Sequence, residues 1–168
     1  MQSVFRGLEQ HELEQHNPTL GGVDLPIVDG KYEAKLGTTY ATMEEGISEI
    51  KRQIQKSRRI RISNIPMSML EEFKPLLKDR DLMVILPVGE RPDETLRELG
   101  PVATTKARIY TDFKGTEANA GSIYFARTVY NIAWANDKIL NIATMEYGKC
   151  VKCMQDTFDG GWRYAQKW

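Results

Sequence analysis

Two cysteines near the C-terminus are the residues of this sequence best suited to metal or redox chemistry. Cys150 and Cys153 form a CxxC motif in which Lys149 and Lys152 adjoin the cysteines. Two thiolates at this spacing converge on one zinc ion or iron–sulfur cluster, or close a redox disulfide, and neighbouring lysines lower the thiol pKa. We therefore take Cys150 and Cys153 as candidate metal ligands. The alternative is two small, half-buried residues at the start of a helix.

Histidine is scarce, which limits the nucleophilic catalysis that the chain can perform. His11 and His16 are the two histidines of the sequence, and both lie near the N-terminus. Together with the two cysteines they could provide a Cys2His2 ligand set for zinc. In this chain, however, the histidines precede the cysteines, which inverts the usual order of such sites. A catalytic triad would require the N-terminal segment to fold back onto the rest of the chain. An unrecognised reaction with Asp112 or Asp137 as general base stays open.

The segment 58–63 alternates arginine with isoleucine, a pattern that predicts a β-strand. Ser63 and Asn64 stand at its carboxyl end, where open α/β sheets bind ligands, so both are candidate ligand-binding residues. The alternative there is a turn and a helix cap. A basic cluster also falls here, formed by Lys56, Arg58, Arg59 and Arg61. Its alternation with Ile60 and Ile62 favours a solvated strand face over an anion or nucleic-acid contact.

The elements that must position these residues alternate between helix and strand. Thr42 and Glu45 form a capping box, and apolar residues follow at helical spacing as far as Ile54. Further helices are expected over 68–77, 92–99 and 151–165. The first of these has a second capping box, Ser68 and Glu71, and a bend at Pro75. The last is interrupted at Gly160 and Gly161. Strands are expected over 81–86, 106–111, 122–133 and 138–145, with a loop over 112–119 and a tight turn at Asn136 and Asp137.

This order predicts an α/β fold with a mixed, mostly parallel sheet, a C-terminal antiparallel hairpin and helices on both faces. Residues 1–39 lack sustained periodicity and predict an irregular N-terminal arm with one short helix over 4–15. Residues 40–168 form the predicted α/β domain. An arm of this length is suited to wrapping a partner.

The strand over 59–63, the helix with Leu70 and Phe73, the strand over 82–86 and the hairpin centred on Asp137 together resemble half of the phospholipase-D-like fold. The closing pattern of Phe158, Trp162 and Ala165 is similar to the last helix of its non-catalytic regulatory version, the effector-binding domain of archaeal TrmB-type transcriptional regulators. The resemblance covers about residues 40–168.

The catalytic signature of that family is His-x-Lys-x-x-x-x-Asp. The matching window here runs from Tyr130 to Asp137, with Tyr130 in the histidine position and Ile132 in the lysine position. A phenol of pKa about 10 and an aliphatic chain replace neither the imidazole nucleophile nor the phosphate-binding cation. The resemblance therefore implies no phosphodiesterase activity but a sensor, regulatory or assembly role, with Tyr130 and Asp137 as candidate ligand-binding residues. No cofactor is expected unless the CxxC motif holds zinc or an iron–sulfur cluster.

Aromatic residues gather after residue 121, including all three tryptophans. Tryptophan and tyrosine are frequent at the centres of protein interfaces, so Trp134, Phe158 and Trp162 are candidate interface residues of a homodimer or a protein complex. Packing in the core is the alternative.

Composition sets the remaining limits. The 168 residues contain 23 basic and 23 acidic side chains, so no overall positive charge attracts nucleic acid, and we expect no direct contact with it. No apolar run approaches the roughly 20 residues of a membrane helix, and the first residues do not form a signal peptide. We expect a cytoplasmic protein that does not contact a membrane.

Overall fold

The computed structural model describes residues 19–20, 23–24, 27–28, 31–32, 40, 42–146 and 148–168. The chain divides into two units, Met1–Lys35 and Leu36–Trp168. In the first, β1 (Thr19–Leu20) pairs with β2 (Val23–Asp24), and β3 (Ile27–Val28) pairs with β4 (Lys31–Tyr32), both antiparallel. The helix predicted over 4–15, including His11, lies outside the described residues. The domain boundary predicted after residue 39 stays a prediction.

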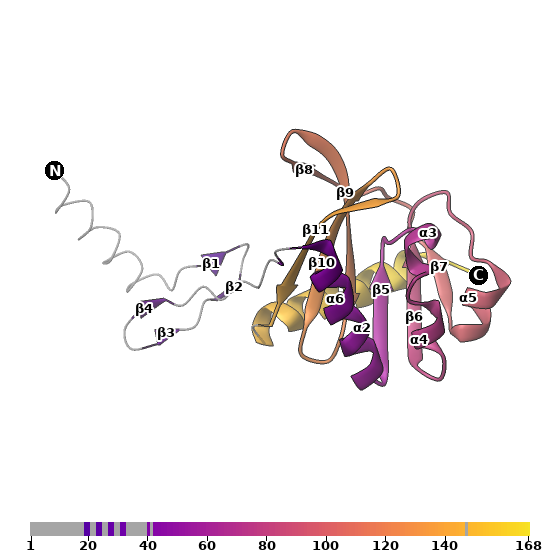
Figure 1. The fold of residues 1–168 in the computed structure, drawn as a ribbon, viewed down its shortest axis with the longest axis horizontal. Helices are drawn as coiled ribbons and strands as arrows, with labels where there is room; N and C mark the ends of the chain where they lie inside the picture. Colours follow the sequence, from indigo (N-terminus) through magenta and orange to yellow (C-terminus); the bar gives the residue numbers. More distant parts are fainter. Residues whose placement is uncertain are drawn as a thin grey trace. The chain divides into compact units, whose positions relative to one another are not determined.

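The second unit is built on an eight-stranded sheet (Figure 1). From one edge to the other the strands follow the order β11-β10-β9-β5-β6-β7-β12, and β8 pairs with β9 beside this path. Their bounds are β5 (Arg59–Ser63), β6 (Asp81–Leu86), β7 (Val102–Thr104), β8 (Tyr110–Phe113), β9 (Thr116–Tyr124), β10 (Val129–Ala135), β11 (Lys138–Met145) and β12 (Gln166–Lys167).

Parallel pairing is confined to β5, β6 and β7 among the described strands. Crossovers through α3 (Met67–Leu70) with α4 (Lys74–Leu77), and through α5 (Glu94–Leu99), connect these three strands. β9 then returns antiparallel beside β5, and β10 and β11 continue as an antiparallel meander. The predicted mixed α/β fold with its closing hairpin is confirmed, although the sheet contains fewer parallel pairings than expected.

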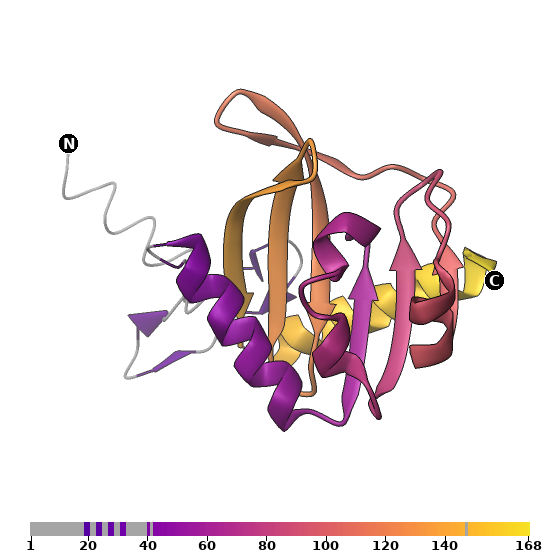
Figure 2. The ribbon, with the colours of Figure 1, turned by 45° about the vertical axis from the view of Figure 1, so that its right-hand side comes forward.

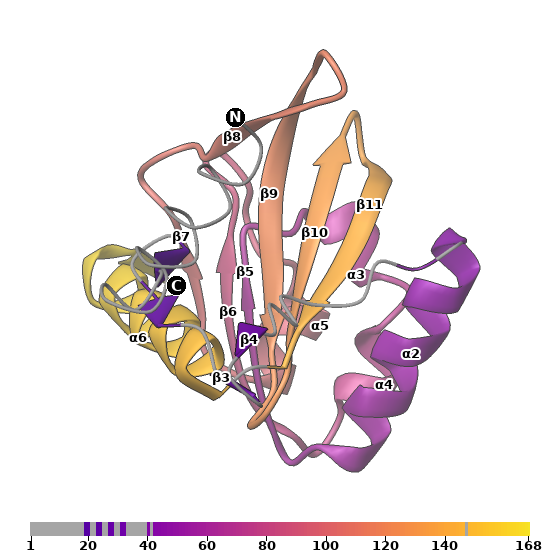
Figure 3. The same cartoon turned by 90° about the vertical axis from the view of Figure 1, so that its left-hand side faces the viewer.

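Helices cover both faces of the sheet, as predicted. α2 (Met43–Lys56) and the crossover helices α3, α4 and α5 lie on one face, and α6 (Gly148–Tyr164) lies on the other (Figure 3). Figure 2 shows α6 crossing behind the strands toward the edge where β12 pairs with β7. No helix in the described part of the chain is long and apolar enough to span a bilayer.

Two hydrophobic cores correspond to these two faces. Ile50 and Ile54 of α2 pack over the sheet with Ile60 and Ile62 of β5. Beneath α6, Val151 and Phe158 pack with Tyr124 of β9 and other residues of the sheet. Successive residues of a strand point to opposite faces. In β5, the isoleucines therefore face α2, and Arg59, Arg61 and Ser63 face α6.

Local sequence signals explain where the helices begin. The Thr42 side chain accepts a hydrogen bond from the Glu45 amide at 3.2 Å, so Thr42 caps α2 and this half of the first predicted capping box is confirmed. The second is wrong, because Ser68 lies inside α3, and Glu71 instead accepts from the Lys74 ammonium group. Proline lacks an amide proton and stands only in the first turn of a helix. At Pro75 the predicted long helix is accordingly divided, and α4 begins one residue earlier.

Two strand predictions and one loop prediction need correction. The strand expected over 106–111 is wrong, because β7 ends at Thr104 and β8 begins only at Tyr110. The expected loop over 112–119 contains the turn of the β8–β9 hairpin, where Gly115 has a φ of +73°. The strand expected over 122–133 is two strands, because the chain reverses between Phe125 and Thr128 through a backbone hydrogen bond of 2.8 Å. The interruption predicted at Gly160 and Gly161 is also wrong, since α6 continues through both residues.

Candidate functional site

Tyr130, the residue in the position of the family's histidine, is buried beneath α2. Its side chain is 1% exposed and belongs to the core on that face. The phenol donates a hydrogen bond of 3.4 Å to Oε1 of Glu49, and its ring stacks at 6.5 Å on the ring of Tyr40. Burial, followed by the charges of Tyr40 and Glu49, raises the pKa of Tyr130. The phenol is therefore held in its protonated form within the core.

Ile132 and Asp137 complete the motif window but do not form a cluster with Tyr130. Ile132 is 1% exposed in the same core. Asp137 is exposed in the turn between β10 and β11, with a φ of +58°. Six residues of mostly extended chain lie between Tyr130 and Asp137, a span on the order of 20 Å. The pKa of Glu90 is raised mainly by burial, and the negative charge of Asp137 raises it further.

Ser63 and Asn64 use their polar groups within the protein. Asn64 has a φ of +53°, and its Nδ2 donates a hydrogen bond of 2.7 Å to the carbonyl of Ala120. Its own carbonyl accepts from Trp134 Nε1 at 2.9 Å, and the Ser63 hydroxyl contacts the Tyr124 hydroxyl at 3.0 Å. Asparagine tolerates the left-handed conformation better than most residues. These contacts favour the turn over the ligand pocket.

The CxxC motif lies in the first turns of α6. The Cys150 side chain is buried and that of Cys153 is exposed, and both thiols are free. Burial raises the pKa of Cys150, and the charge of Cys153 adds to the increase. Among the described residues, no group of three or more histidine, cysteine, aspartate or glutamate side chains lies close enough to hold a metal ion. The metal site at Cys150 and Cys153 stays a prediction.

The three aromatic residues predicted at an interface differ in exposure. Trp134 is 9% and Phe158 2% exposed, which favours core packing for both. Trp162 is partly exposed, stacks on Phe158 with ring centres 6.1 Å apart, and lies 4.0 Å below the Lys167 ammonium group. The large apolar side chains that are most exposed in the described part of the chain are Ile109, Tyr110, Tyr164 and Trp168.

A cavity of about 740 Å³ opens between α6 and the amino-terminal half of β5. Tyr124, Val151 and Phe158 provide its apolar lining. Basic side chains line it from the sheet and from the β9–β10 turn, namely Arg59, Arg61 and Arg127. α6 contributes Lys152, Gln155, Asp156 and Asp159 from the opposite side, and Glu146 lines the cavity just before α6. The cavity therefore has a basic wall and a polar to acidic wall over an aromatic floor.

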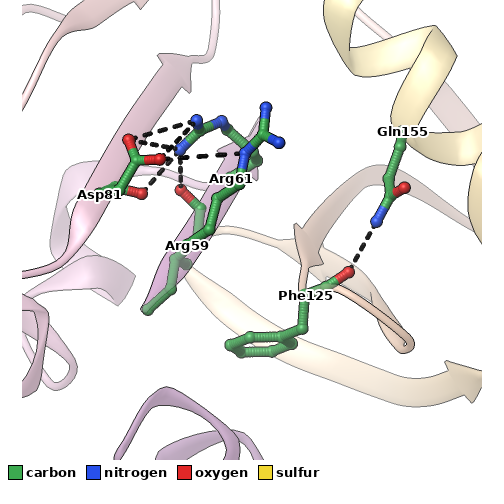
Figure 4. A network of polar contacts seen from close by, with 6 residues as sticks. Arg59, Arg61, Asp81, Phe125 and Gln155 are labelled. Atoms are coloured by element: carbon green, nitrogen blue, oxygen red, sulfur yellow. Dashed lines mark hydrogen bonds and ion pairs between the residues drawn. The ribbon is translucent and has the colours of Figure 1, made fainter. Parts of the chain in front are cut away.

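Arg61 anchors the basic wall (Figure 4). It is 8% exposed, and its Nη atoms bind both carboxylate oxygens of Asp81 at 3.2 to 3.3 Å and the Asp81 carbonyl at 2.7 Å. Arg59 Nε lies 4.0 Å from the same carboxylate. The solvated face predicted for this basic cluster is wrong at Arg61, because α6 covers that face of β5.

Sequence reasoning missed Arg127 and the face that α6 covers. Arg127 stands in a turn that the sequence indicated only as the interior of a strand. The Gln155 side chain donates a hydrogen bond of 2.8 Å to the Phe125 carbonyl and thereby fixes this turn against α6 (Figure 4). The alternation of charge and isoleucine over 58–63 was the available signal, because it placed Arg59 and Arg61 on one face.

Comparison with known proteins identifies the fold. No family model matches this sequence, and no curated protein matches it. One similar structure is that of TrmBL2, described as an archaeal chromatin protein that shows a novel mode of DNA binding, with a TM-score of 0.52 and 10% identity over 99% of this chain. This chain spans 64% of the length of that protein.

Two further similar structures are those of Nuc and NucT. Nuc from Salmonella typhimurium, a phospholipase D family member, has a TM-score of 0.52 and 10% identity. NucT from Helicobacter pylori has a TM-score of 0.55 and 7% identity. Each match covers 79% of this chain and 98% of the other. The chain thus has the phospholipase-D-like fold, as its sequence resemblance predicted.

Proposed function

We propose that this chain is a non-catalytic regulatory domain with the phospholipase-D-like fold, which acts by binding a small molecule and another protein subunit. The observation that carries the proposal is the burial of Tyr130 and Ile132, each 1% exposed. A catalytic nucleophile and a phosphate-binding cation must reach the substrate. Here a phenol and an aliphatic chain occupy those two positions, and both side chains pack in the core under α2.

A regulatory role also agrees with the comparisons. TrmBL2, which has a similar fold, is described as a chromatin protein. That description attributes DNA binding to TrmBL2. For the present chain we propose contact with protein rather than nucleic acid, because its 23 basic side chains are balanced by 23 acidic ones.

Turnover of bis(4-nitrophenyl) phosphate by the full chain tests the absence of catalysis. We expect no release of nitrophenol above buffer, for the wild type and for the Asp137→Asn variant alike. Turnover by the wild type that disappears in Tyr130→Phe or Asp137→Asn would overturn the proposal. A mobility-shift assay with duplex DNA is expected to show no complex at physiological salt, and a saturable complex would contradict the proposed absence of nucleic-acid contact.

A second experiment tests the protein contact. Tyr164 is 80% exposed at the end of α6, close in sequence to the partly exposed Trp162. We propose a homodimer formed through this C-terminal face, because exposed aromatic side chains commonly anchor interfaces. In sedimentation velocity, the Tyr164→Ser variant should dissociate at higher concentration than the wild type, and Tyr110→Ser, on β8, should not. A wild type that is monomeric throughout would contradict the dimer.

A further inference from the structure

The cavity beneath α6 is separate from the ligand-binding residues that the sequence predicted. It begins at Arg59, the first residue of β5, whereas Ser63 and Asn64 stand at the other end of that strand. It also opens on the α6 face of the sheet, whereas Tyr130 packs on the α2 face. A ligand in this cavity would therefore use a different set of side chains.

The basic wall has more positive charge than its own carboxylate neutralises. Asp81 is the one carboxylate paired with both Arg59 and Arg61. Arg127, on the neighbouring turn, makes no hydrogen bond or ion pair within the part of the chain that the structure describes. Three guanidinium groups thus line one wall with one paired carboxylate, whereas the carboxylates of Glu146, Asp156 and Asp159 line the rest of the cavity. An anion at this wall would pair with the guanidinium groups that Asp81 alone does not neutralise.

A buried donor at this wall lacks an acceptor. Arg61 Nε is the single side-chain polar atom in the described residues that is both buried and without a hydrogen-bond partner. Both Nη atoms of Arg61 are already held by Asp81 and by backbone carbonyls. A buried donor without an acceptor costs free energy. An anion in the cavity that Arg61 lines would supply the missing acceptor.

The opposite wall and the floor define the rest of the ligand. Lys152 pairs with Asp156 at 3.1 Å, whereas Asp159 makes no such pair among the described residues, so the α6 side presents acceptors to hydrogen-bond donors. The floor is held in place by the tilted contact of Tyr124 with Phe158, whose ring centres are 5.4 Å apart. The volume of about 740 Å³ falls within the usual range for small-molecule sites.

We propose that this cavity binds a small organic phosphate, with the phosphate group between Arg59, Arg61 and Arg127 and hydroxyl groups of the ligand facing Gln155 and Asp159. A phosphate monoester is close to doubly charged at neutral pH and accepts several hydrogen bonds, which matches guanidinium donors better than a carboxylate does. This inference rests on the proposed regulatory function and names the class of ligand that the domain senses.

Titration of the full chain, followed by amide ¹H–¹⁵N spectra, tests this inference. The probes are ribose 5-phosphate, inorganic phosphate, ribose and acetate. We expect both phosphates to give saturable shifts in residues 124–127 and 148–156, and ribose or acetate alone to give none. Arg59→Gln and Arg127→Gln should each weaken ribose 5-phosphate binding about ten-fold, the loss expected for one charge-assisted hydrogen bond.

Arg58→Gln is the matched control, because Arg58 is exposed, adjoins Arg59 in sequence and does not line the cavity. It should change the dissociation constant less than about two-fold, as expected for a screened surface charge. Absence of saturable shifts with both phosphates would overturn the inference, and so would an equal loss in Arg58→Gln or equally tight acetate binding. Phosphodiester turnover is measured in the same samples. Failed binding without turnover overturns the ligand class alone, whereas turnover overturns the proposed function.

Discussion

The indole Nε1 of Trp134 donates a hydrogen bond of 2.9 Å to the backbone carbonyl of Asn64. This bond joins β10 to the turn that follows β5, two segments that are 70 residues apart in the chain. Trp134 was predicted at an interface and Asn64 in a ligand site, but here the two residues stabilise the sheet together. In this fold, the conformation of the turn after β5 depends on a side chain from the antiparallel half.

Trp134→Phe removes that donor while keeping an aromatic ring in the core. The carbonyl of Asn64 then loses a buried hydrogen bond, so we expect the free energy of unfolding to fall by about 1–3 kcal/mol. Urea denaturation measures the change. Trp162→Phe is the control, because the indole of Trp162 is partly exposed. Equal losses in the two variants would show that the bond to Asn64 contributes nothing.

Two glycines allow a test of close packing against helix propensity. A Cβ at Gly121 would lie 2.5 Å from the Asn64 carbonyl oxygen, and one at Gly160 would meet nothing within 4 Å. Gly121→Ala should therefore destabilise the protein by about 1–3 kcal/mol through a clash with backbone. Gly160→Ala, inside α6, should stabilise it by about 0.5–1 kcal/mol. Thermal unfolding distinguishes the two, and a gain at Gly121 would contradict the observed packing.

Much of this fold follows from local sequence signals. The capping hydroxyl of Thr42, the alternation over 58–63 and the apolar run over 81–86 each act within a few residues, so the elements they specify were predictable. The turn at Phe125 and Thr128 was not, because apolar residues flank Arg127 and Thr128 on both sides and the hydrogen bond of the turn forms only after the chain reverses. Apolar residues alone do not distinguish one long strand from a hairpin.

The candidate site was less predictable than the fold, because it depends on which element covers which face. Periodicity placed Arg59 and Arg61 on the same side of β5, but it gave no information on what would cover that side. Only the packing of α6 buries Arg61 and brings the β9–β10 turn with Arg127 next to it. Contacts between segments so far apart in the chain cannot be predicted from the local pattern of one sequence.

Asp93 contributes to stability through Lys74, and this contribution depends on pH. Hydrogen bonds from the Lys74 ammonium group and from the Leu96 amide lower the pKa of Asp93. A carboxylate with a lowered pKa stabilises the fold above its unfolded pKa of about 3.9, and the stabilisation disappears as the pH falls through the lower folded value. Asp93→Asn keeps the helix cap but removes the charge.

We therefore expect Asp93→Asn to be less stable than the wild type at pH 7, and the difference to shrink below pH 4 or so. Glu94→Gln is the control, because Glu94 is exposed on the same helix. Chemical denaturation at several pH values measures both. A stability difference that stays constant down to pH 2 or so would contradict the role of the Lys74 pair.

The two thiols of the CxxC motif should react at different rates. Cys150 is buried and its pKa is raised by that burial, whereas Cys153 is exposed. Since the thiolate is the reactive form, iodoacetamide at pH 7.5 should modify Cys153 first and Cys150 only after unfolding. Mass spectrometry of digested samples follows each site, and Cys153→Ser should leave the folded protein almost unmodified. Protection of both thiols until a chelator is added would instead support the metal site.

Restoring the family's catalytic residues should fail to restore catalysis. Tyr130→His combined with Ile132→Lys recreates the His-x-Lys spacing, but both positions face the core beneath α2. A lysine at position 132 would bury a charge without a partner, which costs about 3–5 kcal/mol. We expect a marked loss of stability in urea denaturation and no hydrolysis of bis(4-nitrophenyl) phosphate. The single change Tyr130→Phe keeps the buried ring and should cost about 1 kcal/mol, because it removes the hydrogen bonds of the phenol with Glu49 and Tyr40 without creating a cavity. A folded double variant that hydrolyses the diester would show that these positions reach a substrate after all.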